Sequence, residues 1–88
     1  MTKLNDSKQA LQNLGIAALN EMQEAAVSNI IHHKNVLLLS PTGSGKTLAF
    51  LIPLLEHLNP KGNLVQALVL TPSRELAIQI EQVWKAMQ

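Results

Sequence analysis

The sequence has no cysteine and no tyrosine, and its 88 residues include one phenylalanine and one tryptophan. Without cysteine, a disulfide framework and a cysteine-based metal site are both excluded. The longest apolar run, Leu48–Leu55, contains Pro53 and is far too short to cross a bilayer. The N-terminus also lacks the apolar core of a secretory signal. We therefore expect a cytoplasmic protein that does not associate with a membrane.

Charge of either sign is also scarce. Seven Lys and Arg residues stand against six Asp and Glu residues, which gives a formal net charge of +1. There is no basic tail or patch, so any contact with nucleic acid has to be argued from specific residues. With 47% hydrophobic residues, the composition indicates a globular domain or a piece of one.

The stretch Ser40–Thr47 reads Ser-Pro-Thr-Gly-Ser-Gly-Lys-Thr and follows the apolar run Val36–Leu39. An apolar strand, a Gly-rich turn and a helix that opens with Lys-Thr are typical of the phosphate-binding loop of nucleotide-hydrolysing proteins. Gly43 and Gly45 permit a tight turn, and the backbone N–H groups then converge on an anion at the helix N-terminus. The alternative, a plain Gly/Ser-rich linker, is disfavoured by the strand and helix patterns on either side.

Each polar group of this loop has an expected role. We expect Lys46 to contact the β- and γ-phosphates, and the Thr47 hydroxyl to coordinate the Mg²⁺ that bridges them. These two are the candidate catalytic residues. The other candidate nucleotide-binding residues of the loop are Thr42, Gly43, Ser44 and Gly45. Ser40 stands where the general pattern has Gly, so the strict motif is missed by one residue. The loop predicts a site for a nucleoside triphosphate with Mg²⁺.

Hydrophobic periodicity and cap residues predict the order α-α-β-α-β-α. Helices are expected at Lys3–Leu14, Asn20–Ile31, Gly45–Leu58 and after Thr71–Ser73, and strands at Val36–Ser40 and Val65–Thr71. A strand, a helix and another strand in succession imply a right-handed parallel crossover, so the fold class is α/β. Two strands cannot by themselves form a stable sheet that is covered on both faces. We therefore expect residues 1–88 to be the N-terminal portion of a larger domain, truncated at Gln88.

Three stretches narrow the family: Gln23, the loop Ser40–Thr47, and Thr71–Ala77, which reads Thr-Pro-Ser-Arg-Glu-Leu-Ala. In this order and spacing they resemble the start of the first RecA-like domain of DEAD-box RNA helicases. In that family the loop begins with Ala or Ser instead of the first Gly, as at Ser40. The resemblance covers about Gly15 to Gln79. It implies an incomplete RecA-like P-loop NTPase domain from a protein that couples ATP binding and hydrolysis to RNA duplex unwinding.

The resemblance also implies roles for individual residues. Gln23 would recognise the adenine edge, because a carboxamide both donates and accepts hydrogen bonds. Ser44 to Thr47 would hold the phosphates of ATP and its Mg²⁺. The residues implied to touch the RNA backbone are Pro72, Ser73, Arg74 and Glu75. Ser73 replaces the usual Thr of that motif and keeps the hydroxyl, and the guanidinium of Arg74 suits a bidentate bond to phosphate.

Local interpretations compete with two of these roles. Asn20-x-x-Gln23 is close to a capping box, in which the Gln23 side chain bonds the backbone of Asn20. Ser73 fits a helix N-cap, which would make Arg74 and Glu75 ordinary first-turn surface residues. The residues alone leave both pairs of interpretations open.

The chain departs from the family pattern at two points. It has Leu19-Asn-Glu-Met22 where Pro-Thr-Pro-Ile is common, and no aromatic residue precedes Phe50. The DEAD tetrapeptide, the Ser-Ala-Thr motif and the second RecA-like domain are absent from the sequence, and Asp6 is the only aspartate. Because phosphoryl transfer needs a carboxylate to organise Mg²⁺, we expect this chain alone not to hydrolyse ATP efficiently.

Other functions remain as alternatives. One is a non-catalytic nucleotide-binding or interaction fragment, and another is a DNA helicase of the same superfamily. A small-molecule kinase with a phosphate loop is a weaker third, since Gln23 and the series Arg74–Ala77 argue against it.

Overall fold

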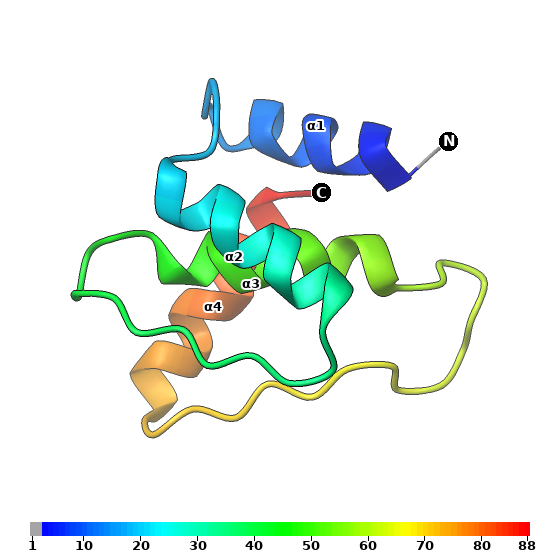
Figure 1. The fold of residues 1–88 in the computed structure, drawn as a ribbon. Helices are drawn as coiled ribbons and strands as arrows, with labels where there is room; N and C mark the ends of the chain where they lie inside the picture. Colours follow the sequence, from blue (N-terminus) through cyan, green and yellow to red (C-terminus); the bar gives the residue numbers. More distant parts are fainter. Residues whose placement is uncertain (1–2) are drawn as a thin grey trace.

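The computed structural model describes residues 3–88, and these residues form four helices. The helices are α1 (Lys3–Asn13), α2 (Glu21–His32), α3 (Lys46–His57) and α4 (Arg74–Ala86). Helix α3 lies at the centre, where α1 and α2 both pack against it and α4 crosses it (Figure 1). None of these four helices is long and apolar enough to span a membrane.

Local sequence signals set the helix ends close to where they were predicted. At the end of α1, Gly15 adopts a φ of +73°. The Ile16 N–H donates to the Leu11 carbonyl oxygen (2.9 Å), and the Gly15 N–H donates to that of Gln12 (3.0 Å), as in a left-handed C-cap. Helix α4 begins after Ser73, whose Oγ accepts from the Leu76 N–H (3.2 Å). The Ser73 cap, one of the two interpretations that the sequence left open, is confirmed.

The core joins three of the four helices. Its buried members are Ala10 of α1, Leu51 and Ile52 of α3, and Met87 at the end of α4. Phe50 and Trp84 pack partly buried against this cluster. Because the central helix contributes two of the four buried side chains, packing determines which face of α3 is turned toward the core.

Two side-chain hydrogen bonds anchor α1 to the rest of the molecule. The Ser7 hydroxyl donates to Glu56 Oε1 of α3 (2.8 Å), and Asn13 Nδ2 donates to the Met87 carbonyl oxygen (2.9 Å). Among the described side chains, no buried nitrogen or oxygen lacks a partner. The polar side-chain atoms that are buried among the helices are therefore all hydrogen-bonded.

The predicted strands are not formed in residues 3–88, so the α/β order is not confirmed. Residues 36–40 and 65–71 have no regular secondary structure, although both run below the helices in the same direction (Figure 1). Their side chains are largely exposed, with 84% for Leu37 and 90% for Val65. A strand is stabilised by ladder hydrogen bonds and by contacts with neighbouring strands. The described residues offer only these two segments, and the segments do not pair.

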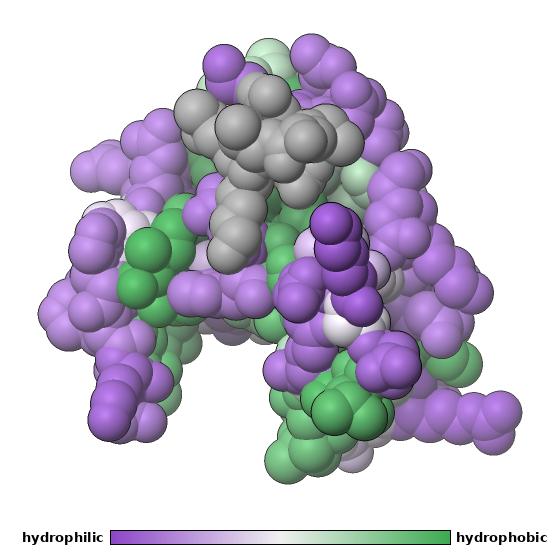
Figure 2. All heavy atoms as spheres, turned by 90° about the vertical axis from the view of Figure 1, so that its right-hand side faces the viewer, coloured by the Kyte–Doolittle hydropathy of each residue, from purple (hydrophilic) through white to green (hydrophobic). Residues whose placement is uncertain are grey.

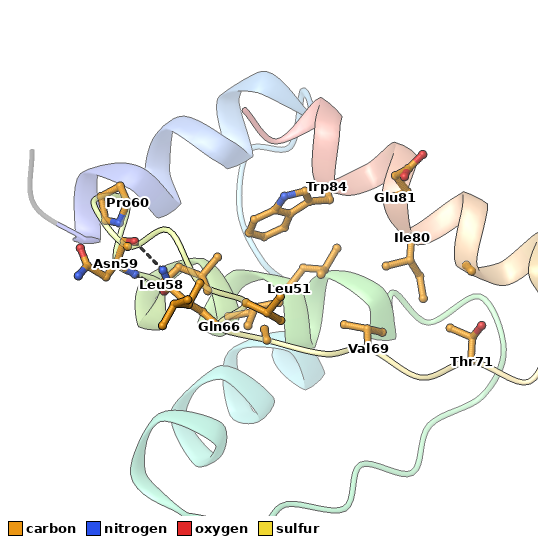
Figure 3. Close-up of a pocket in the computed structure, with 16 residues that line it drawn as sticks. Leu51, Leu58, Asn59, Pro60, Gln66, Val69, Thr71, Ile80, Glu81 and Trp84 are labelled. Atoms are coloured by element: carbon orange, nitrogen blue, oxygen red, sulfur yellow. Dashed lines mark hydrogen bonds between the residues drawn. The ribbon is translucent and has the colours of Figure 1, made fainter.

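Residues 58–71 stand away from the helices and leave an apolar groove of about 530 Å³. Leu51 lines it from α3, Ile80 and Trp84 from α4, and Val69 from the irregular segment (Figure 3). On the face seen in Figure 2, hydrophobic side chains gather on both sides of a notch that is open to solvent. This groove and notch are the direct consequence of an apolar segment that has no sheet to join.

Candidate phosphate-binding site

The loop between residue 40 and α3 has the backbone conformation that its glycines predict. Gly43 and Gly45 adopt φ values of +83° and +91°, a region that side chains with a Cβ rarely occupy. Gly45 is the N-cap of α3, so the helix opens with Lys46 and Thr47. A Cβ at position 45 would also collide with Nε2 of Gln23. The predicted tight turn into a helix that begins with Lys-Thr is confirmed.

Bonds within the loop close it on itself. Lys46 Nζ donates to the Ser40 carbonyl oxygen (2.6 Å). The Ser44 hydroxyl donates to the Pro41 carbonyl oxygen (2.6 Å), and it also bonds the hydroxyl of Ser40. Since Ser44 has one hydroxyl proton, Ser40 is the donor in that second bond. The ammonium of Lys46 is thus held at the loop, where a phosphate oxygen can replace the carbonyl as a stronger, charged acceptor.

Gln23, at the start of α2, is bonded at both ends of its carboxamide. Its Oε1 accepts from the Asn20 N–H (2.9 Å), and its Nε2 donates to the Gly45 carbonyl oxygen (3.1 Å). The Asn20 Oδ1 accepts from the Gln23 N–H (2.8 Å), which completes the capping box. The capping interpretation is therefore confirmed. A carboxamide has two N–H groups and two oxygen lone pairs, so one of each is left over on Gln23, whose residue is 6% exposed.

Asn20 makes a further bond that its role as a cap does not require. Its Nδ2 donates to the Ser44 carbonyl oxygen (3.2 Å), 24 positions along the chain. This contact was not predicted from the sequence. The available signal was chemical: an Asn that caps a helix uses its oxygen, and its amide nitrogen is left without a local partner.

The remaining loop residues differ in exposure. Thr42 and Gly43 are exposed, whereas Ser44 to Thr47 are half-buried. No group of three His, Cys, Asp or Glu side chains in the described part of the chain is placed to hold a metal ion. N–H, hydroxyl and ammonium donors suit an anion that brings its own metal ion better than they suit a bare cation.

Pro72, Ser73, Arg74 and Glu75 all lie exposed at the N-terminus of α4. The Thr71 hydroxyl donates to the Ser73 carbonyl oxygen (2.8 Å), which fixes the turn into the helix. Within residues 3–88, no hydrogen bond joins these four residues to the phosphate loop. The structure therefore brings together Asn20, Gln23 and the loop, but leaves the second motif as a separate surface.

Comparison with known proteins gives one family and many relatives. A family model described as DEAD/DEAH box helicase matches residues 20–88. The chain is 44% identical over 75 residues to the DEAD-box ATP-dependent RNA helicase CshC of Bacillus cereus, covering 85% of this chain and 19% of the relative. It is 44% identical over 87 residues to the ATP-dependent RNA helicase DDX55 of Xenopus laevis, covering 92% of this chain and 15% of the relative. No solved structure matches.

Proposed function

Because this chain belongs to the DEAD/DEAH box helicase family, we propose that it forms the ATP-binding portion of an ATP-dependent RNA helicase. The chain spans less than a fifth of the length of the relatives reported above, so hydrolysis and unwinding are proposed for a complete protein. There, residues 1–88 are the N-terminal portion of a RecA-like domain. Residues 36–40 and 65–71 then pair with further strands, which restores the α/β arrangement.

The observation that carries this proposal is the loop from Ser40 to α3. Two glycines at positive φ lead directly into a helix whose first residues are Lys46 and Thr47. In the proposed complex, backbone N–H groups and the Lys46 ammonium bind the phosphates of ATP, and the Thr47 hydroxyl is a ligand of the Mg²⁺ that accompanies them. Bound Mg²⁺ supplies neutralisation of the charge that develops on the phosphates.

Gln23 is proposed to recognise adenine while it continues to cap α2. Its capping and loop bonds use one N–H and one lone pair, and the second of each is available to the edge of a purine that offers a donor and an acceptor side by side. At this edge adenine presents the N6 donor and the N7 acceptor, whereas guanine presents two acceptors, O6 and N7. The proposed consequence is a preference for ATP over GTP.

Arg74 is proposed to bind the backbone of RNA in the complete protein. It is exposed, and it stands in the first turn of α4 behind a formed N-cap. A guanidinium at a helix N-terminus adds its charge to the N–H groups that already point outward there. Such a contact is to phosphate and carries no sequence preference.

Nucleotide titration of Lys46→Ala in the full chain tests this proposal. Loss of the charge-assisted bonds should weaken Mg-ATP binding by about 1.5 to 3 kcal/mol, measured by calorimetry. The control is Lys61→Ala, which removes the same charge from an exposed loop outside the site and should bind ATP like the parent. Titration of the parent with GTP should give the weaker binding. Equal affinity of the parent and the Lys46→Ala variant for ATP would contradict the phosphate-loop assignment.

A further inference from the structure

We propose that Asn20 is a positioning residue for the phosphate loop, which aims the Gly45 N–H at bound phosphate. This inference rests on the proposed nucleotide site. It concerns a residue at which this chain departs from the pattern that it otherwise resembles.

Two amide donors from the first turn of α2 hold two consecutive carbonyl groups of the loop. Asn20 Nδ2 donates to the Ser44 carbonyl oxygen (3.2 Å), and Gln23 Nε2 donates to that of Gly45 (3.1 Å). These are the last two carbonyl groups before Lys46, the residue that opens α3. The N–H groups of the same two peptide units belong to Gly45 and Lys46, where the anion is proposed to bind.

Because the peptide unit is planar and trans, these two hydrogen bonds also set the direction in which the Gly45 and Lys46 N–H groups point. The peptide bonds here are trans, and in a trans unit the C=O and the following N–H point in opposite directions. When Asn20 draws the Ser44 carbonyl toward α2, the Gly45 N–H is turned away from α2. Gln23 does the same for the Lys46 N–H through the Gly45 carbonyl oxygen, which also accepts from the Ala49 N–H of α3 (3.3 Å). Two carbonyl oxygens that would repel a phosphate are thereby withdrawn, and two donors are left facing it.

An external anchor matters at this point of the chain because Gly45 does not fix its own backbone. Glycine occupies both signs of φ with similar ease, so the peptide between Ser44 and Gly45 can reverse at little cost unless something holds it. The Gln23 bond holds the next peptide, and only Asn20 holds this one from α2. Asn20 is thus the contact on which the direction of the Gly45 N–H depends.

The cap and the anchor use different atoms of Asn20, so they can be separated by substitution. The cap needs only the oxygen, which accepts from the Gln23 N–H, and Asp or Ser supplies an equivalent acceptor. The anchor needs the amide nitrogen, which neither replacement has. Asn29→Ser is the matched control, because Asn29 Nδ2 donates to the Ala25 carbonyl within α2 (2.8 Å) and not to the loop.

The test compares Asn20→Asp, Asn20→Ser and Asn29→Ser with the parent in the full chain, with Mg-ATP as the titrant. Loss of one hydrogen bond should raise the Kd for ATP about three- to ten-fold in both Asn20 variants. The midpoint of thermal unfolding should fall only slightly and equally in both Asn20 variants, by the value of one exposed hydrogen bond, since the cap is kept. The amide resonance of Gly45 should shift in both Asn20 variants before any ligand is added. Asn29→Ser should match the parent in Kd and in the Gly45 resonance.

The outcomes separate this inference from the function on which it rests. If the parent binds ATP, Lys46→Ala does not, and both Asn20 variants bind like the parent, the positioning role is overturned and the nucleotide site stands. Weakening in Asn20→Asp alone would assign the effect to a carboxylate beside the phosphates and would also overturn it. A parent that binds no ATP would overturn the function and the inference together.

Discussion

The phosphate loop and the apolar segments at residues 36–39 and 64–70 are both irregular, but they are irregular in opposite ways. The loop is bonded at almost every turn: Lys46 and Ser44 bond its own carbonyl groups, and Asn20 and Gln23 bond it from α2. The apolar segments expose the side chains that should be buried, such as Leu70 at 84%. One region has a definite structure without being a helix or strand, and the other has the sequence of a strand without the structure.

The difference follows from where the bonding partners of each region lie. Every side chain that bonds the loop belongs to a residue between 20 and 46, so these contacts are all supplied by this chain. A buried parallel strand instead needs a neighbour on each edge and a layer on each face. Helices α3 and α4 supply part of one layer only. The candidate binding site can therefore be formed while the sheet that would support it is not.

The largest expected effect is a difference in stability between a substitution in the core and the same substitution in the unpaired segment at residues 64–70. Leu51→Ala should lower the free energy of unfolding of the 88-residue chain by about 2 to 5 kcal/mol, because Leu51 is 1% exposed. Leu70→Ala makes the same chemical change at an exposed position and should cost less than about 0.5 kcal/mol. Denaturant titration of both variants measures the two values.

Equal costs for the two variants would remove the contrast, because they would mean that Leu70 is buried in the folded chain. The same pair can be made in a complete protein. If residues 65–71 form a strand there, as proposed, the cost of Leu70→Ala should rise toward that of Leu51→Ala.

The parts of the fold that could be predicted are those with a short-range cause. The Asn20 and Ser73 caps each depend on a residue three positions away, and both were recognisable in the local sequence pattern. The two predicted strands are not confirmed, because an apolar run is stable as a strand only when a distant partner is present. Both segments are apolar, as a buried strand would be, but their side chains are largely exposed because no sheet is formed in the described residues.

The second effect, smaller than the first, is the loss of stability when the contact between Gln23 of α2 and Gly45 of the loop is disrupted. Gly45→Ala and Gly43→Ala both place an L residue at positive φ, which costs about 1 to 2 kcal/mol. At Gly43 a Cβ meets nothing within 4 Å, whereas at Gly45 it meets Nε2 of Gln23. Gly45→Ala should therefore cost about 1 kcal/mol more, the value of the displaced hydrogen bond, in thermal or denaturant unfolding.

Gly43→Ala is the control for backbone strain in this pair. Equal losses of unfolding free energy in the two variants would show that the Gln23 contact does not contribute to stability. The bond between α2 and the loop would then no longer distinguish the loop from the apolar segments. Measuring ATP binding alongside stability would then show whether the loop still accepts phosphate.

The loop backbone of the candidate site could be predicted from the sequence, but the contacts of the loop with the start of α2 could not. The spacing of Gly43, Gly45, Lys46 and Thr47 predicted the turn and the helix start, because those requirements are set by backbone geometry at each position. The bond from Asn20 to Ser44 spans 24 positions; the sequence shows that the amide nitrogen of a capping Asn is left without a local partner, but not which distant carbonyl group it bonds. For Gln23, the local pattern predicted a capping role and the family resemblance implied adenine recognition. The structure confirms the capping role, and adenine recognition stays a prediction.

The smallest expected effect lies where the second apolar segment rejoins the ordered fold, at the N-terminus of α4. Ser73→Ala removes the cap bond to the Leu76 N–H and should lower the free energy of unfolding by about 1 kcal/mol. Arg74→Ala, one residue later and exposed, should change stability by less than about 0.5 kcal/mol. In a complete protein, Arg74→Ala should instead weaken binding to single-stranded RNA, and more so at low salt, because a phosphate contact is lost. If RNA affinity is unchanged in Arg74→Ala, the start of α4 acts only as a helix cap. The proposed binding role of this chain would then rest on the phosphate loop and α2 alone.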